Sequence, residues 1–219
     1  MLDAVQPKSE ASPTGGDALE ALTAAVSVTG AQVEQLIAFR SLLAEASVRF
    51  NLIGPSVMAD FWRRHALDSA QLVGLAPSAR LWTDLGSGAG FPGVIIAILI
   101  QGRPGVQVTL IESMGKRCRF LEHVRDSLSL PVTVRQERAE AVRLKADIVT
   151  ARACAPLPRL LEFARPHLSQ GAIGLFLKGR EVESELTAAR AHWRLDAELL
   201  PSLSDPAGRV LKVNRLERA

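Results

Sequence analysis

Cysteine is scarce in this chain, and long hydrophobic runs are absent. Only Cys118 and Cys154 occur among 219 residues, and they do not form a CxxC pair. Two such cysteines are too few for a disulfide framework, which is typical of a reducing compartment. The longest apolar run, residues 94–100, is far shorter than the roughly 20 residues that span a bilayer. We therefore expect a cytoplasmic protein without a membrane anchor.

An excess of charge of either sign is also lacking. The chain has 26 lysines and arginines against 23 acidic residues, a formal net charge of +3. This balance does not by itself indicate nucleic acid, so the distribution of charge is more informative than its sum. Basic residues gather at 63–65, at 116–119, and at Arg135, Arg138, Arg143 and Lys145. Each cluster fits a solvated helix face as well as a positive surface around one cleft.

The hydrophobic pattern changes along the chain. Residues 1–16 are polar and match neither a secretory signal nor an Arg-rich transit peptide, so we expect a flexible tail. Residues 17–77 carry apolar positions at helical spacing, with a break at 51–55, and predict a helical cap. From residue 78 to 219, short apolar runs alternate with helical segments. This pattern is typical of an α/β domain with a parallel sheet.

The α/β region predicts one mostly parallel sheet. Strands are expected at 81–85, 106–111, 132–134, 147–150 and 173–177, with a closing pair at 195–200 and 210–216. Helices are expected at 92–100, 116–128, 157–168 and 180–191, and they are amphipathic enough to cover both faces. Only the turn-rich residues 201–208 separate the last two strands. We therefore predict an antiparallel hairpin at the sheet edge.

A glycine-rich turn joins the first strand to its helix. Residues 84–93 read DLGSGAGFPG, and glycine allows the backbone to turn sharply and to approach a ligand closely. An ordinary tight junction would also use glycine. In the GxGxxG fingerprint of nicotinamide dinucleotide sites, however, the third glycine stands where this chain has Phe91. Asp84 would disfavour a pyrophosphate and favour a cationic aminoacyl group. The turn, with Gly86 and Gly88, therefore favours S-adenosylmethionine.

Polar residues follow the next three strands. Glu112 ends the second strand and can accept hydrogen bonds from both ribose hydroxyls of an adenosine, or cap the helix that begins near residue 116. Ala139 and Glu140 follow the third strand, where an adenine edge would be read. Arg152 ends the fourth strand, at the edge where ligands of open α/β folds bind. A lone arginine is more often a surface residue, but this position favours a role in the site.

Taken together, these segments resemble the glucose-inhibited division protein B family, the guanine-N7 methyltransferases of small-subunit ribosomal RNA. The resemblance runs from about residue 50 to 212. Its pieces are FNLI at 50–53, RHALDS at 64–69, the turn at 84–93, ESMGKR at 112–117, FL at 120–121, AE at 139–140, ARA at 151–153 and LKG at 177–179. Each piece alone is weak, and the combination is specific.

The resemblance implies a class I S-adenosylmethionine-dependent methyltransferase fold, with a Rossmann-like sheet. It implies methyl transfer from S-adenosyl-L-methionine to N7 of a guanine in the 530 loop of 16S ribosomal RNA, within the small subunit or its precursor. Cofactor contacts are expected at Gly86, Phe91, Ala139, Glu140 and Arg152, with Asp84, Gly88 and Glu112 beside them. His65, Asp68 and Lys178 become candidates for positioning the base or its phosphates. No metal is expected, and we expect a monomer.

The chain departs from the family pattern at three positions. Members commonly have proline at Ala89, an aliphatic residue at Phe91 and an aromatic residue at Cys154. These differences predict altered cofactor packing in a site that is retained.

The implied reaction narrows the chemistry. Guanine N7 has a free lone pair, so alignment of the reactants is needed and an obligatory general base is not. The chain has no tyrosine, and therefore lacks the Pro-Pro-Tyr motif typical of amino-directed enzymes. Cys154 lacks the preceding proline of a cytosine-C5 nucleophile, and we interpret it as a small buried apolar residue. Three alternatives stay open: a related methyltransferase acting on another RNA nucleotide, a nicotinamide-dependent oxidoreductase, and an inactive RNA-binding module.

Overall fold

The computed structural model describes residues 15–219. The tail expected at 1–16 lies outside the described residues, apart from Gly15 and Gly16, which begin the first helix. Among residues 15–219, none of the helices combines the length and the apolar character that a transmembrane span requires.

Helices fill the segment before the sheet. They are α1 (Gly15–Ala25), α2 (Gly30–Phe50), α3 (Pro55–Ala59), the π-helix η1 (Phe61–Leu67) and α4 (Asp68–Leu75). Helix α2 begins with a capping box, in which Thr29 and Gln32 each accept a hydrogen bond from the other's backbone N–H. It ends at Asn51, whose backbone adopts the left-handed conformation typical of a helix end. This end coincides with the predicted break at 51–55.

Seven strands form one sheet in the order β3-β2-β1-β4-β5-β7-β6. Their bounds are β1 (Leu81–Leu85), β2 (Gln107–Glu112), β3 (Val132–Gln136), β4 (Ile148–Arg152), β5 (Ile173–Lys178), β6 (Trp193–Pro201) and β7 (Arg209–Arg218). The first five are parallel, and β7 is antiparallel to both β5 and β6. The predicted antiparallel hairpin is therefore confirmed, with β6 outermost.

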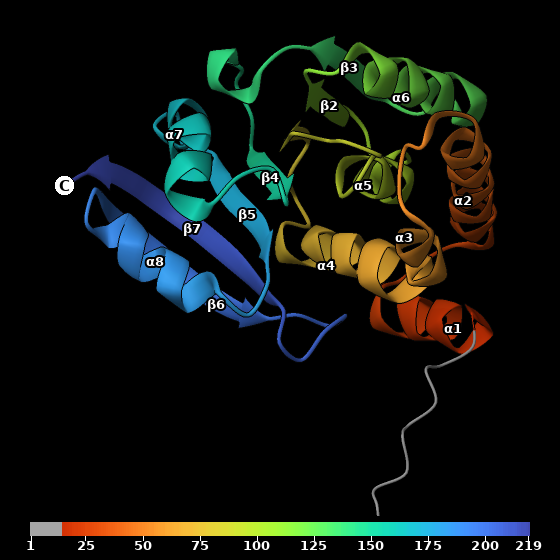
Figure 1. Ribbon diagram of the computed structural model, residues 1–219, viewed down its shortest axis with the longest axis horizontal. Helices are drawn as coiled ribbons and strands as arrows, with labels where there is room; N and C mark the ends of the chain where they lie inside the picture. The colour runs from red at the N-terminus through yellow and green to blue at the C-terminus, as the bar shows by residue number, and fades with distance from the viewer. Residues whose placement is uncertain (1–14) are drawn as a thin grey trace, which may run out of the picture.

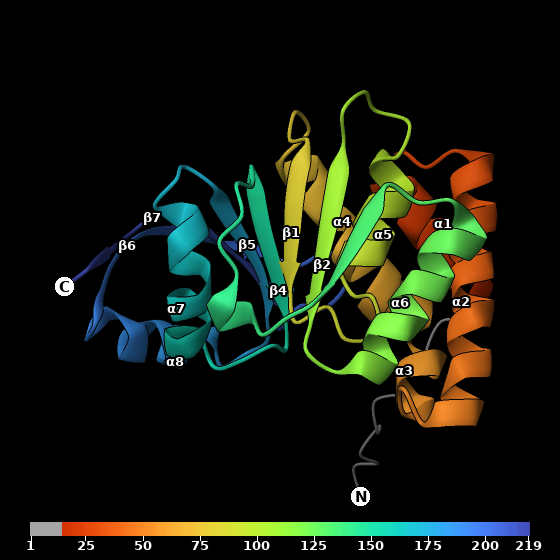
Figure 2. The ribbon, with the colours of Figure 1, turned by 90° about the horizontal axis from the view of Figure 1, so that it is seen from above.

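Helices cover both faces of the sheet. They are α5 (Gly93–Ile100), α6 (Gly115–Leu128), α7 (Leu157–Leu168) and α8 (Val182–Arg190), with the short 3-10 helix η2 (Ala139–Ala141) after β3. The predicted strands and helices of this region are all present, with ends shifted by at most two residues. Figures 1 and 2 place α2 and the hairpin β6–β7 at opposite ends of the molecule.

Two hydrophobic cores follow from the alternation of strand residues. Leu175 and Leu177 of β5 join the core with α2, α4, α5 and α6, whereas Phe176 between them joins the core with α7 and α8. Every residue of α5 is buried, since it is apolar all round and lies between the sheet and helices α2 and α4. The helices before residue 78 thereby reach the carboxyl edge of the parallel strands.

Candidate active site

The glycine turn after β1 has a backbone that few other residues adopt. The φ angles of Gly86, Gly88 and Gly90 are +70°, +57° and +100°. A Cβ on Gly86 would lie 2.6 Å from the Sγ atom of Cys154, and one on Gly90 would lie 2.7 Å from a methyl group of Val94. The turn is therefore closed against the segment after β4 and against α5, and side chains are excluded from it.

Asp84 lies beneath this turn and is 1% exposed. Its Oδ1 accepts a hydrogen bond from the Thr150 hydroxyl at 2.9 Å, and its Oδ2 accepts one from the Gly93 N–H at 3.3 Å. Burial raises the pKa of this carboxyl to about 6. Both oxygens thus have partners inside the protein, and Asp84 links β1, β4 and the start of α5.

Glu112 reaches the turn from the end of β2. Its Oε2 accepts a hydrogen bond from the Gly88 N–H at 3.0 Å, and its Oε1 accepts one from the Met114 N–H at 2.8 Å. Arg117 lies 3.7 Å from the same carboxylate. The contact with Met114 agrees with the capping interpretation. Because each carboxylate oxygen has two acceptor sites, one on each remains for a ligand.

A pocket of about 240 Å³ lies between η2 and the segment after β4, and Cys154 of its lining faces Gly86 of the turn. Its lining brings together Ala139, Glu140 and Cys154 with Ser113 and Phe163. Ala139 and Glu140 belong to η2, and Cys154 follows β4. Burial, aided by nearby acidic groups, raises the pKa of the Cys154 thiol to about 11. The structure therefore gathers the residues that were predicted to surround an adenine and keeps the thiol neutral.

Phe91, His65 and Arg152 form a stack beside the turn. The His65 and Phe91 rings are 4.9 Å apart, and the guanidinium carbon of Arg152 lies 5.6 Å from the Phe91 centroid. Among the described residues, Nδ1 of His65 and Nη1 of Arg152 are buried without a hydrogen-bond partner. Burial, together with Arg152 and Arg64, lowers the pKa of His65 to about 3. The imidazole is therefore neutral.

The aromatic side chain at Phe91 has a structural reason. Its ring meets Phe39 of α2 edge-on at 5.7 Å and Phe61 of η1 at 6.0 Å. The departure from an aliphatic residue therefore joins the turn to the preceding helices. Helical spacing in the sequence indicates that Phe39 is buried, but it does not reveal this partner.

A second pocket, of about 380 Å³, lies beyond Arg152 at the ends of β4 and β5. Asp68, Arg152 and Lys178 all line it, together with Glu185 and Ser204. Lys178 forms an ion pair with Glu185, which also accepts a hydrogen bond from the Leu157 N–H. His65 is not part of this lining. Two of the three residues predicted to position the base thus share the pocket, and the third lies against Phe91.

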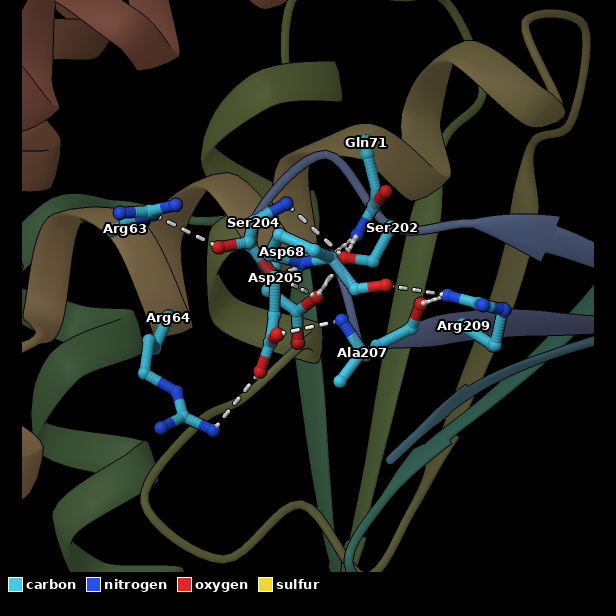
Figure 3. Close-up of polar contacts among 11 residues, drawn as sticks. Arg63, Arg64, Asp68, Gln71, Ser202, Ser204, Asp205, Ala207 and Arg209 are labelled. Atoms are coloured by element: carbon cyan, nitrogen blue, oxygen red, sulfur yellow. Dashed lines mark hydrogen bonds and ion pairs between the residues drawn. The ribbon is translucent and has the colours of Figure 1, made fainter. Parts of the chain in front are cut away.

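Asp68 is held by a network that the sequence did not suggest. Its Oδ1 accepts hydrogen bonds from Ser202 Oγ at 3.1 Å, Ser204 Oγ at 2.7 Å and Gln71 Nε2 at 2.9 Å. Arg63 donates to the Ser204 carbonyl at 3.0 Å. Figure 3 shows these side chains converging from helix α4, η1 and the loop between β6 and β7. No local signal reveals contacts between residues more than 130 positions apart.

Two of the predicted basic clusters lie in different parts of the structure. Arg64 forms an ion pair of 3.5 Å with Asp205 at the rim of the second pocket. Lys116 and Arg119 of α6 line a groove of about 440 Å³ with Arg49 and His123, beside α2. Within residues 15–219, no group of three or more His, Cys, Asp or Glu side chains is placed to hold a metal ion.

Comparison with known proteins agrees with this arrangement. The family described as rRNA small subunit methyltransferase G matches residues 32–206. The ribosomal RNA small subunit methyltransferase G of Caulobacter vibrioides is 57% identical over 195 residues, covering 89% of this chain and 90% of that protein. The protein of the same name from Caulobacter sp. strain K31 is 50% identical, covering 94% of this chain and 91% of its own length.

A solved structure supports the fold. Magnesium protoporphyrin IX methyltransferase from Synechocystis, determined with bound S-adenosylmethionine, superposes with a TM-score of 0.53. The two are 14% identical, and the match covers 86% of this chain and 98% of the other. The sheet is thus that of the class I methyltransferases.

Proposed function

The chain belongs to the rRNA small subunit methyltransferase G family, and we propose that it methylates N7 of a guanine in the 530 loop of 16S ribosomal RNA. It is a methyltransferase that uses S-adenosyl-L-methionine, and its substrate class is the RNA of the small ribosomal subunit. One observation carries the proposal: two pockets lie on either side of the segment after β4, where Ala155 and Pro156 line both. Arg152, at the end of β4, lines the second pocket and stands beside Phe91 of the turn.

The first pocket and the turn suit the cofactor. Gly88 presents bare backbone, against which a nucleoside packs without steric conflict, and Gly86 allows the turn to close against Cys154 of the pocket lining. Glu112 uses its remaining acceptor sites for the ribose hydroxyls. Ala139 and Glu140 line the pocket of about 240 Å³ that receives the adenine. Glu112 at the end of β2 thus faces the ribose, and Ala139 and Glu140 after β3 face the adenine.

Two further residues act on the aminoacyl side of the cofactor. Asp84 is a positioning residue, because both of its oxygens bond to the protein and its charge lies under the turn. Phe91 forms a wall of the site with Arg152 and His65. Within residues 15–219, Nδ1 of His65 and Nη1 of Arg152 in this wall are enclosed and have no hydrogen-bond partner.

The residues align the reactants and do not remove a proton. When bound, S-adenosyl-L-methionine supplies a strongly electrophilic methyl group. Guanine N7 has a free lone pair, so the reaction requires alignment, an effect that can lower a barrier by up to about 7 to 11 kcal/mol through proximity and orientation. His65 stays neutral, and Lys178 is held by Glu185. Asp68 and Lys178 line the pocket that receives the base.

The RNA partner is recognised through shape and phosphates. Proteins reach base edges chiefly in single-stranded loops of RNA. The groove beside α6, with Lys116, Arg119 and Arg49, supplies cationic groups for phosphates, so affinity falls as salt rises. Since the net charge is only +3, we expect recognition of RNA shaped within a subunit. Much weaker methylation of an unstructured oligonucleotide is the expected result, and equal methylation would contradict it.

We infer that the protein works as a monomer in the cytoplasm, where small subunits are assembled. We also propose that residues 17–77 act as a cap that forms one wall of the site, on residues 78–219 as the methyltransferase domain. The packing of Phe39 and Phe61 on Phe91 supports this division of roles.

The decisive experiment maps N7-methylguanosine in 16S ribosomal RNA from cells with and without this protein. The purified protein is then added, with methyl-labelled S-adenosyl-L-methionine, to small subunits that lack the modification. Label at N7 of one guanine in the 530 loop is the expected result. Label at another nucleotide would favour a related RNA methyltransferase, and no label on any subunit RNA would favour an inactive RNA-binding module. Family membership decides against the nicotinamide-dependent oxidoreductase.

A further inference from the structure

Asp68 occupies an unusual place in the fold. It is the first residue of α4, directly after the π-helix η1. A π-helix is rare in proteins and often marks a functional site, because its wider turn changes the direction in which side chains point. Here the change of helix type coincides with the second pocket, which Asp68 lines.

The carboxylate of Asp68 is fixed in orientation, and one of its oxygens is left over. Three donors, from Gln71, Ser202 and Ser204, all bond to Oδ1. No residue in the described range donates a hydrogen bond to Oδ2. The protein does not enclose this oxygen either. Oδ2 is therefore an accessible acceptor, held still by the bonds to its neighbour.

The other charges of the pocket are largely matched. Lys178 is paired with Glu185, and Arg64 is paired with Asp205. This leaves Asp68 and Arg152 as the two charged side chains of the lining that form no ion pair in the described structure. The pocket thus offers one anionic acceptor and one cationic donor. With one charge of each sign left over, the pocket has no excess of positive charge for a phosphate, and a neutral ligand with a donor next to an acceptor fits better.

Guanine has this combination on adjacent positions. Its N1–H and N2–H groups are neighbouring donors, and its O6 is an acceptor next to them. Adenine and cytosine present a ring nitrogen that accepts, which would face a carboxylate without a proton between them. Uracil has one such donor, flanked by two acceptors. A carboxylate beside a guanidinium therefore distinguishes guanine from the other three bases.

We propose that Asp68 determines base specificity. Its Oδ2 accepts hydrogen bonds from the N1–H and N2–H groups of the target guanine, while the Arg152 guanidinium, which lines the same pocket, donates to O6. N7 lies on the other side of O6 from N1, and this orientation turns N7 toward the glycine turn that Arg152 and Phe91 adjoin. The inference rests on the proposed function, because it assumes a guanine target.

The experiment compares guanosine with inosine, which lacks the N2 amino group, at the target position of reconstituted small subunits. Wild-type protein is expected to methylate the inosine subunits at least tenfold more slowly, because a hydrogen bond to a charged group is lost. Asp68→Asn is expected to be slower on guanosine and to treat the two subunits within about twofold of each other. The comparison between proteins cancels any intrinsic difference in reactivity between the two bases.

A matched variant separates base reading from loss of the network. Ser202→Ala removes one donor to Oδ1 and keeps the carboxylate, so the inosine penalty should remain as in the wild type. Calorimetry with S-adenosylhomocysteine shows whether Asp68→Asn keeps its fold and its cofactor site. Should that variant fail to fold, the wild-type protein alone still tests the inference.

The outcomes separate the two proposals. Equal rates of the wild type on guanosine and inosine, or an inosine penalty that Asp68→Asn retains in full, would overturn the role of Asp68 and leave the proposed function standing. Absence of label at N7 of the guanosine subunit would overturn both.

Discussion

The imidazole of His65 is stacked on the ring of Phe91, with centroids 4.9 Å apart and ring planes at 28°. This contact joins η1 to the glycine turn, and it takes the imidazole out of water, since His65 is 7% exposed. Arg152 adds a positive charge nearby. Both effects oppose protonation of the ring, so its charge state is a property of the folded protein.

The stability of the protein should therefore fall in acid because of His65. The pKa of His65 is about 3 in the folded protein and 6.5 in the unfolded chain. Between these values the unfolded chain therefore binds more protons than the folded protein. The contribution is fully present above pH 6.5 and is lost as the pH falls toward 3. Each pKa unit corresponds to about 1.4 kcal/mol, which sets an upper bound of about 5 kcal/mol.

His65→Phe keeps an aromatic ring against Phe91 and removes the titration. Chemical denaturation at several pH values between 3 and 7 measures the free energy of unfolding of both proteins. The wild type should lose more stability than the variant across this interval. Parallel curves for the two proteins would contradict the assignment.

Local sequence patterns predicted the sheet because each strand is a short apolar run between turn residues. They also placed Glu112 and Arg152 correctly, because a residue that ends a parallel strand lies at the carboxyl edge whatever the rest of the chain does. Ala139 and Glu140 follow from the same rule. The part of the site that depends on strand ends was thus accessible from the sequence.

Contacts between segments far apart in the chain could not be predicted from the sequence. Asp68 meets Ser202 and Ser204 because β7 folds back beside β5, and no spacing within either segment encodes this meeting. Asp84 was expected to face a cationic group, but its orientation depends on Thr150, which lies 66 residues away. Side-chain direction at a strand end is set by its partners, and these become known only when the fold is known.

Gly86→Ala should impair both folding and cofactor binding. The new methyl would lie 2.6 Å from Cys154 Sγ, at a φ of +70°. The left-handed backbone alone costs about 1 to 2 kcal/mol for a residue with a side chain. Thermal denaturation and calorimetry with S-adenosylhomocysteine should show a lower melting temperature and at least tenfold weaker binding.

Gly74→Ala is the matched control for this substitution. Gly74 lies in α4 with nothing within 4 Å of an added Cβ, so alanine should stabilise the helix by up to about 1 kcal/mol.

Cys154→Ala combined with Gly86→Ala should restore part of the loss, since it removes the sulfur. Full recovery in this double variant would show that backbone strain plays no role, and no recovery would show that the contact with sulfur plays none.

Arg152→Ala should weaken cofactor binding and slow methyl transfer. The guanidinium stands 5.6 Å from the ring of Phe91 in the glycine turn and lines the second pocket, and a hydrogen bond to a charged group is worth about 1.5 to 3 kcal/mol. We expect about a tenfold loss of affinity for S-adenosylhomocysteine and a larger loss of turnover. Arg152→Lys should recover less than half of the turnover, because a lysine lacks the planar fork.

Arg190→Ala, at the exposed end of α8, is the control for a general loss of positive charge. It should leave affinity and turnover within about twofold of the wild type. Unchanged affinity and turnover in Arg152→Ala would remove that residue from the site.

Asp84→Asn tests the carboxylate under the turn through its pH dependence. The pKa of Asp84 is about 6 when folded and 3.8 when exposed, so the folded protein binds more protons between these values. Relative to the asparagine variant, the wild type is therefore most stable below pH 3.8 and loses stability as the pH rises toward 6. The loss is at most about 3 kcal/mol, because two pKa units separate the states.

The asparagine should fit without strain. Its amide oxygen can accept the Gly93 N–H, and the Thr150 hydroxyl can rotate to accept from the amide nitrogen. At pH 7.5 the variant should thus be at least as stable as the wild type. It should bind S-adenosylmethionine severalfold more weakly, since the negative charge under the cationic aminoacyl group is gone.

Asp147→Asn provides the comparison at the opposite end of β1. The Asp147 carboxylate accepts hydrogen bonds from the N–H groups of Arg80 and Leu81 at 2.8 and 2.9 Å. Its replacement should lower stability and leave affinity for S-adenosylmethionine unchanged, because this end of the strand is far from the turn. Denaturation curves from pH 4 to 7, with binding measured at pH 7.5, test all three proteins together. Equal affinity of the wild type and Asp84→Asn for S-adenosylmethionine would confine Asp84 to a role in folding. The substitution removes a charge, and it changes the affinity only if the bound cofactor interacts with that charge.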